Sequence, residues 1–116
     1  MRIFKYKGTI HFHDWETLRK KIENCIVREE ETGGLEIVID FRDNDNDRTY
    51  YSVKLIKLDR NIYKGEILNK TNIENSVVCR YYKFENYIAL IGEWDQNGHD
   101  FYWNCELEKE SEIESE

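Results

Sequence analysis

The chain has 116 residues, the length of one small domain. Charged residues make up 35% of it, and 17 Lys and Arg against 24 Asp and Glu give a formal net charge of -7. No apolar run is long enough for a transmembrane helix, and an aromatic content of 14% argues against a disordered chain. The acidic excess disfavours nucleic acid as a partner, because such binding depends on neutralising phosphates. The same excess favours association with a basic protein.

The N-terminal residues and the cysteines predict a cytoplasmic protein that does not bind a membrane. Residues 1–7 alternate charged and apolar side chains, whereas a signal peptide needs a continuous apolar core. The three cysteines Cys25, Cys79 and Cys105 are odd in number and none stands in a C-x-x-C pair. They are expected to be free thiols in a reducing compartment, with neither a disulfide framework nor a metal site.

Residues 3–12 have the alternation of a half-buried strand. One face carries the apolar side chains Phe4, Tyr6, Ile10 and Phe12. Gly8 falls on this same face, which indicates a bend or the close approach of another element.

The next segment has the spacing of an amphipathic helix. Its apolar residues recur three and four positions apart, which places them on one helical face; they are Trp15, Leu18, Ile22, Cys25 and Ile26. Asp14 is positioned to cap the first turn, and Gly33 and Gly34 can adopt the left-handed backbone that ends a helix. The pattern predicts one helix between the first and second strands.

Beyond the helix the period changes to two and predicts six further strands. They cover residues 35–42, 50–58, 62–68, 76–84, 87–94 and 101–107. Asn97-Gly98 is a strong hairpin signal. The expected fold is α+β and mainly β: one strand, one amphipathic helix, then about six antiparallel strands in a meander. Because one helix cannot cover both faces of seven strands, the sheet must curl into a half-barrel or small barrel, or cover its second face with another copy.

The sequence predicts a single globular domain over residues 1–107. Residues 108–116 carry five glutamates at alternate positions, with Ile113 as their one apolar anchor. Mutual repulsion of these charges predicts a disordered, solvated acidic tail.

Two short patterns resemble metal sites. His11-x-His13 places two imidazoles on one side of a strand, but tetrahedral zinc needs further ligands, and His99 or Asp14 could join only if the fold brings them close. The second pattern, Asp43-x-Asp45-x-Asp47, lacks the glycine and the final glutamate of a calcium-binding loop. We expect surface histidines and an acidic hairpin tip, and no metal or other cofactor.

The sequence lacks the common catalytic motifs. It contains no G-x-S-x-G elbow, P-loop or dinucleotide-binding fingerprint. A Cys–His nucleophile pair would depend on residues that meet only in the fold. The three cysteines fit inward-facing positions of their elements, so we expect inert thiols and a protein that is not an enzyme.

Aromatic side chains concentrate in the last third of the chain, where they suit either a core or a binding surface. By alternation, Trp94 and Trp103 share the inward face with Leu90, Gly92 and Cys105. Tyr87, Ile91 and Tyr102 then face outward as an exposed apolar patch. The candidate binding residues are Tyr82, Tyr87, Ile91, Trp94, Tyr102 and Trp103.

The segment Leu90-Ile91-Gly92-Glu93-Trp94, a turn with Gly98, then Phe101-Tyr102-Trp103 resembles the Gly-x-Trp hairpins of lipocalin-like and avidin-like meander barrels. The resemblance covers about 18 residues, and a helix after the first strand departs from the order in those families. The order of one strand, one helix and six strands also resembles the start of helix-grip barrels, but those end in a long helix. Either resemblance implies a binding barrel and not a catalyst.

These observations favour a small non-catalytic protein that recognises another protein or a second copy of itself, and the acidic charge favours a basic partner. An immunity, inhibitor or accessory factor of bacterial or phage origin fits the proline-free composition, which is rich in Ile, Asn, Lys and Glu. Two alternatives stay open. The first is a barrel that holds a small apolar or aromatic ligand between the sheet and the Trp15 helix. The second is a hydrolase or metal enzyme that uses His11, His13, His99 or a thiol.

Overall fold

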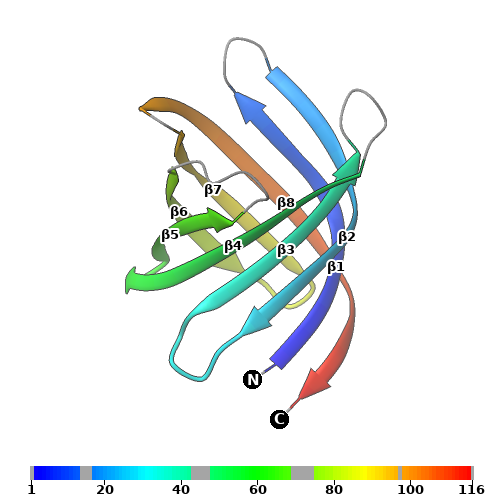
Figure 1. Ribbon diagram of the computed structural model, residues 1–116. Helices are drawn as coiled ribbons and strands as arrows, with labels where there is room; N and C mark the ends of the chain where they lie inside the picture. Colours follow the sequence, from blue (N-terminus) through cyan, green and yellow to red (C-terminus); the bar gives the residue numbers. More distant parts are fainter. Residues whose placement is uncertain (1, 14–16, 43–47, 69–74, 97, 116) are drawn as a thin grey trace.

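The computed structural model describes residues 2–13, 17–42, 48–68, 75–96 and 98–115 (Figure 1). These residues form eight antiparallel strands that pair in chain order and close into a barrel. The strands are β1 (Arg2–His13), β2 (Thr17–Glu29), β3 (Leu35–Arg42), β4 (Arg48–Asp59), β5 (Ile62–Leu68), β6 (Asn75–Lys83), β7 (Tyr87–Gln96) and β8 (His99–Ser115). The expected antiparallel meander is confirmed, and of the alternatives left open by the sequence the sheet adopts the closed barrel.

The predicted helix is wrong: the structure is all-β, and no helix occurs among the described residues. The segment forms β2, which carries a β-bulge. The pairing of β2 with β1 shifts in register between Tyr6 and Gly8 of β1. The pairing of β2 with β3 shifts between Ile22 and Asn24 of β2. Glu23 and Asn24 at the bulge are both exposed, while Ile22 and Cys25 on either side are buried. The extra residue turns an apolar spacing of two into a spacing of three, which imitates a helix.

The two glycines after β2 form a tight turn and not a helix end. Gly33 has a positive φ of 92°, and its N–H donates to the carbonyl of Glu30 at 3.0 Å. The N–H of Glu30 donates in turn to the carbonyl of Gly34 at 2.9 Å. The left-handed backbone expected of glycine is present, but it joins β2 to β3.

The acidic residues after Leu107, predicted to be a disordered tail, continue β8 as far as Ser115 and pair with β1. Figure 1 shows the two ends of the chain side by side. Basic side chains of β1 offset the glutamates: Arg2 pairs with Glu112 at 2.9 Å, and Lys5 lies 3.5 Å from Glu110. The charge pattern of β8 alone did not reveal that its neighbour would be a strand with basic side chains opposite these glutamates.

The buried core fills the inside of the barrel, with contributions from all eight strands. It contains Phe4, Tyr6, Ile10, Ile22, Cys25, Val27, Leu35, Ile37, Ile39, Val53, Leu55, Tyr63, Ile67, Val77, Cys79, Tyr81, Ile88, Leu90, Trp94, Trp103, Cys105 and Leu107. Closure hides one face of the sheet in this core without the need for a covering helix. The other face of every strand forms the outer wall.

Glycines allow the strands to approach one another inside the curved wall. A Cβ on Gly8 would lie 1.8 Å from the carbonyl oxygen of Glu106, and one on Gly65 would lie 1.7 Å from that of Lys54. Both contacts are with backbone, so a side chain could not simply move aside. The expectation of a close neighbour at Gly8 is confirmed.

Candidate binding face on the outer wall of β6, β7 and β8

Exposed apolar side chains gather on the outer wall of β6, β7 and β8. Ile91 is 55% exposed and Tyr102 is 62% exposed, although both have bulky side chains. The other exposed members are Val78, Phe84 in the turn after β6, and Tyr87, while Tyr82 is half-buried. We call this surface the β6–β8 face. A contiguous exposed apolar surface is typical of an interaction site.

The register places these side chains in rows across the three strands. One row runs from Val78 through Glu93 to Tyr102. The next runs from Arg80 through Ile91 to Asn104. A third runs from Tyr82 through Ala89 to Glu106. At the end of the face the rings of Phe84 and Tyr87 lie 6.0 Å apart, next to Glu108.

Carboxylates flank the apolar side chains on the β7 and β8 part of this face. The outward positions carry Glu93, Asp95, Asp100, Glu106 and Glu108. Arg80 of β6 adds one positive charge beside Ile91. The carboxylates make the β6–β8 face both apolar and acidic.

Two depressions open on this face along β8. The upper depression, of about 330 Å³, is lined by Ile91, Tyr102 and Asn104 together with His13. The lower depression, of about 500 Å³, is lined by Tyr87, Asn86, Glu108 and Lys7. Glu106 lines both depressions. Each depression therefore combines an aromatic side chain with the same carboxylate.

The structure divides the six predicted binding residues into two groups. Tyr82, Tyr87, Ile91 and Tyr102 lie on the β6–β8 face, whereas Trp94 and Trp103 are 4% and 5% exposed and belong to the core. The alternation of β7 and β8 had placed both indoles inward, so the six residues do not form one site. Val78, Phe84 and Glu106 were not chosen from the sequence, although the same alternation places Val78 and Glu106 outward.

Trp94 belongs to an aromatic cluster inside the barrel, and Trp103 lines the small cavity beside it. The Trp94 ring lies 4.8 Å from Phe101 and 5.4 Å from Tyr51, and 6.1 Å from Phe12. The side chains around this cluster line a cavity of about 20 Å³, which is room for roughly one water molecule. Neither indole N–H has a hydrogen-bond partner among the described residues.

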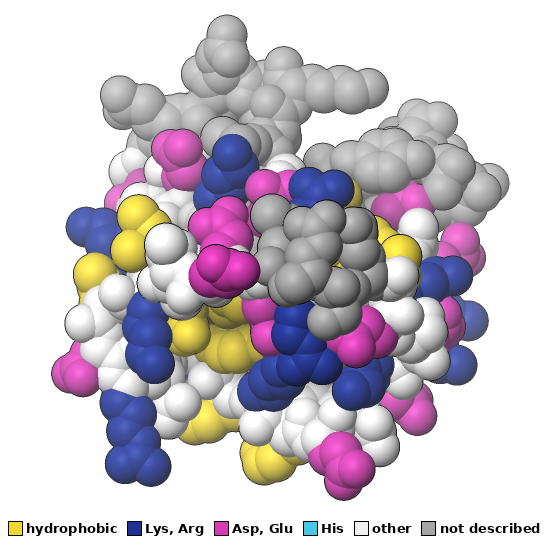
Figure 2. Space-filling view, turned by 90° about the horizontal axis from the view of Figure 1, so that it is seen from below, with side chains coloured by type: hydrophobic (Ala, Val, Ile, Leu, Met, Phe, Trp, Pro, Cys, Tyr) yellow, Lys and Arg dark blue, Asp and Glu magenta, His cyan; other side chains and the backbone are white. Residues whose placement is uncertain are grey.

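The opposite end of the barrel holds three buried tyrosines beneath a group of charges. Burial raises the pKa of Tyr6 to about 12 and also raises the pKa values of Tyr63 and Tyr81, and the negative charge of Glu29 raises all three further. Lys83 pairs with Glu29 and lies 5.1 Å from the centre of the Phe4 ring. Figure 2, seen from this end, shows basic and acidic side chains around apolar ones.

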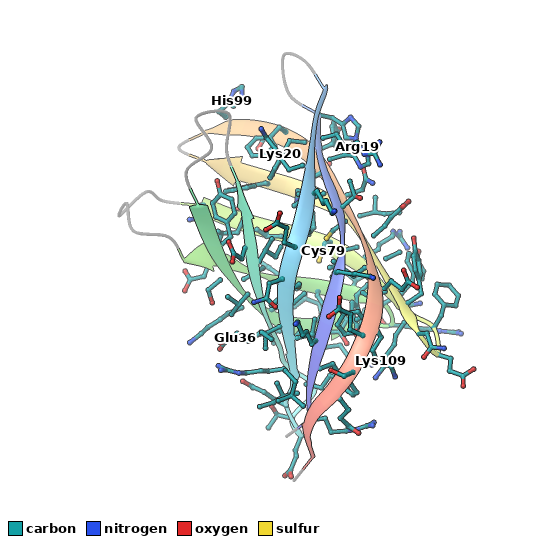
Figure 3. The ribbon with its side chains drawn as sticks, turned by 90° about the vertical axis from the view of Figure 1, so that its right-hand side faces the viewer. Arg19, Lys20, Glu36, Cys79, His99 and Lys109 are labelled. Atoms are coloured by element: carbon teal, nitrogen blue, oxygen red, sulfur yellow. The ribbon has the colours of Figure 1, made fainter. Side chains whose placement is uncertain are left out.

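The histidines do not meet in a metal site. His11 and His13 stack on the outer wall with ring centres 6.1 Å apart, and the His13 ring shares a 2.9 Å hydrogen bond with Asn104. His99 contacts Phe101 instead and lies at the far upper end of the barrel (Figure 3). Within the described ranges no three His, Cys, Asp or Glu residues are grouped so that they could hold a metal ion. Asp14, Asp43, Asp45 and Asp47 lie outside those ranges.

The three cysteines are free and buried. Burial raises the pKa of Cys25 and of Cys79 to about 12, and burial is also the main cause that raises the pKa of Cys105 well above its ordinary value. Figure 3 shows Cys79 inside the barrel wall. Thiols in this state are weak nucleophiles, because the reactive form is the thiolate.

No family model matches this chain. The chain is 33% identical over 104 residues to the variant surface glycoprotein MVAT5 of Trypanosoma brucei rhodesiense. The match covers 86% of this chain but spans only 20% of that glycoprotein's length. Within the part of the chain that the structure describes, no helix has the length and hydropathy to cross a membrane.

Proposed function

We propose that this protein is a non-catalytic binding barrel, lipocalin-like in its meander, that recognises a basic protein through the β6–β8 face. The observation that carries the proposal is the exposure of Ile91 and Tyr102 in neighbouring rows of one wall that also carries exposed carboxylates. Large apolar side chains at an interface supply the buried area, and complementary charge supplies orientation and rate of encounter.

Barrel closure supports recognition through side chains. In the closed barrel every strand pairs with a neighbour on each side, which leaves little free edge to which a partner could add a strand by backbone pairing. Closure therefore favours a partner that packs against the wall. The 20 Å³ cavity at the Trp94 cluster also favours the outer wall over the interior, because a drug-sized ligand needs several hundred Å³.

We further propose a reducing, cytoplasmic location for the chain. Three buried cysteines without a disulfide are usual where glutathione and thioredoxin keep thiols reduced. Fractionation of cells that carry the natural protein tests this proposal.

A capture experiment with matched variants tests the binding function. The full chain is immobilised and exposed to lysate from its source cells, beside a variant with Ile91→Asp and Tyr102→Asp. The control carries Ile56→Asp and Leu58→Asp, which change two equally exposed apolar residues on β4, away from the face. We expect basic proteins to bind the wild type and the control but not the face variant, and to be released by salt. Equal capture by all three chains, or no capture, would overturn the proposal.

Light scattering across a range of protein concentrations tests the second occupant considered for this face, another copy of the chain. A basic-partner surface predicts a monomer at every concentration, because two acidic faces repel each other. A dimer that the Ile91→Asp and Tyr102→Asp changes dissociate would replace the basic partner with self-association.

A further inference from the structure

We infer that the β6–β8 face recognises a pair of arginine side chains, one in each depression, with Glu106 shared between them. This inference rests on the proposed function and specifies its partner. It follows from the lining of the two depressions, each of which has one tyrosine and the carboxylate of Glu106.

Each depression has the two groups that an arginine uses. Tyr102 borders the upper depression and Tyr87 the lower one, and both rings are exposed. A guanidinium stacks on an aromatic face and at the same time donates two parallel hydrogen bonds to a carboxylate. Lysine has a compact ammonium group that cannot combine a planar stack with a two-pronged hydrogen bond.

Glu106 can serve both depressions because it lies between them on β8 and is exposed. In the lower depression Glu108 adds a second carboxylate, while Lys7 is drawn toward Glu110 at 3.9 Å. In the upper depression the amide of Asn104 is held by His13. The net charge of each depression is therefore suited to a cation.

The spacing of the depressions restricts the partner sequence. Asn104, which lines the upper depression, and Glu108, which lines the lower one, are four residues apart on β8, or roughly 13 Å along a strand. An extended segment covers the same distance in four residues and points positions i and i+4 to the same side. The geometry therefore fits two arginines separated by three residues in an extended segment.

The test uses a synthetic pentapeptide amide with arginine at its first and fifth positions and alanine between, titrated into the full chain and followed by NMR. We expect shifts confined to the β6–β8 face and tighter binding than for the same peptide with two lysines. Glu106→Gln should weaken arginine-peptide binding at least about fivefold, and Tyr102→Leu or Tyr87→Leu about threefold each, because each change removes one contact and keeps the bulk of the wall. Glu66→Gln, an exposed carboxylate on β5, is the control and should leave binding unchanged.

Each outcome has a defined meaning. Equal binding of the lysine peptide, or an equal effect of Glu106→Gln and Glu66→Gln, would overturn the arginine assignment. If the peptide does not bind while capture of a basic protein still depends on Ile91 and Tyr102, the inference fails and the proposed function stands. If the peptide does not bind and no basic protein is captured, the inference and the proposed function both fail. Circular dichroism of every variant shows whether the barrel is intact.

Discussion

The side chain of Asn75 pairs with both backbone polar groups of Ile67. The N–H of Ile67 donates to Oδ1 of Asn75 at 2.6 Å, and Nδ2 of Asn75 donates to the carbonyl of Ile67 at 2.7 Å. The backbone pairing of β5 with β6 runs only from Ile62–Arg80 to Gly65–Val77. Asn75 therefore extends the contact between these two strands with a side-chain amide that imitates a strand residue.

We expect Asn75→Ala to lower the free energy of unfolding by about 1–3 kcal/mol. The substitution leaves two part-buried backbone groups of Ile67 without these partners. Urea denaturation measures the effect, and Ser76→Ala at the adjacent exposed position is the control. Equal stability of the two variants would show that Asn75 does not join the strands.

Gly65→Ala should lower the free energy of unfolding by about 1–3 kcal/mol or more, as overpacking does in a well-packed core. The new Cβ would lie 1.7 Å from the carbonyl oxygen of Lys54, so β4 and β5 would have to separate. Thermal denaturation followed by circular dichroism checks this effect, with Glu66→Ala as an exposed control on the same strand. A variant as stable as the control would mean that the strands separate at little cost.

Seven of the eight strands could be predicted from alternation, because closure buries one face and leaves the other exposed. The exception, β2, shows what a local period cannot reveal. Its bulge at Glu23 and Asn24 is fixed by pairing with β1 and β3, which lie on either side in space. The pairing of β8 with β1 was equally hidden, because it joins residues about a hundred positions apart.

The candidate site shows the same division. Alternation correctly separated outward Tyr87, Ile91 and Tyr102 from inward Trp94 and Trp103. It could not show that Glu106 lies between two depressions, since their walls also include His13 and Lys7 of β1. The many aromatic residues in the last third of the chain led to the choice of Trp94 and Trp103 as binding residues, but both side chains are buried in the core.

The end of β8 should stabilise the barrel through strand pairing more than through its charges. Glu112→Gln is expected to cost less than about 1 kcal/mol, because Arg2 and Glu112 are partly exposed and such ion pairs are weak. Removal of residues 109–116 should cost a few kcal/mol, because each lost ladder hydrogen bond contributes about 1 kcal/mol. It also removes Lys109, which lies 5.3 Å from the centre of the Phe4 ring. The denaturant midpoints of the two variants are compared. A truncated chain with unchanged stability would show that residues 109–116 do not stabilise the barrel.

Native protein should resist modification by a thiol reagent at mildly alkaline pH. The three thiols are buried, and burial raises the pKa of Cys25 and of Cys79 from 9.0 to about 12. All three should react at once in denaturant, where they are exposed and their pKa values return to normal. Fast reaction of one thiol in the folded protein would reveal a reactive cysteine and weaken the non-catalytic assignment.

The same shifts predict that the barrel loses stability above about pH 9. A thiol with a raised pKa in the folded state keeps its proton there while the unfolded chain releases it, so the unfolded state is stabilised relative to the folded state as the pH rises. For Cys25 the loss runs from pH 9.0 to about 12, and for Tyr6 from 10.0 to about 12. Each such group contributes a slope of about 1.4 kcal/mol per pH unit within its window. Urea denaturation at successive pH values measures the slope. Cys25→Ala should lower the free energy of unfolding at neutral pH, but it should also reduce the pH slope by the contribution of one titrating group. An unchanged slope would contradict the raised pKa of Cys25.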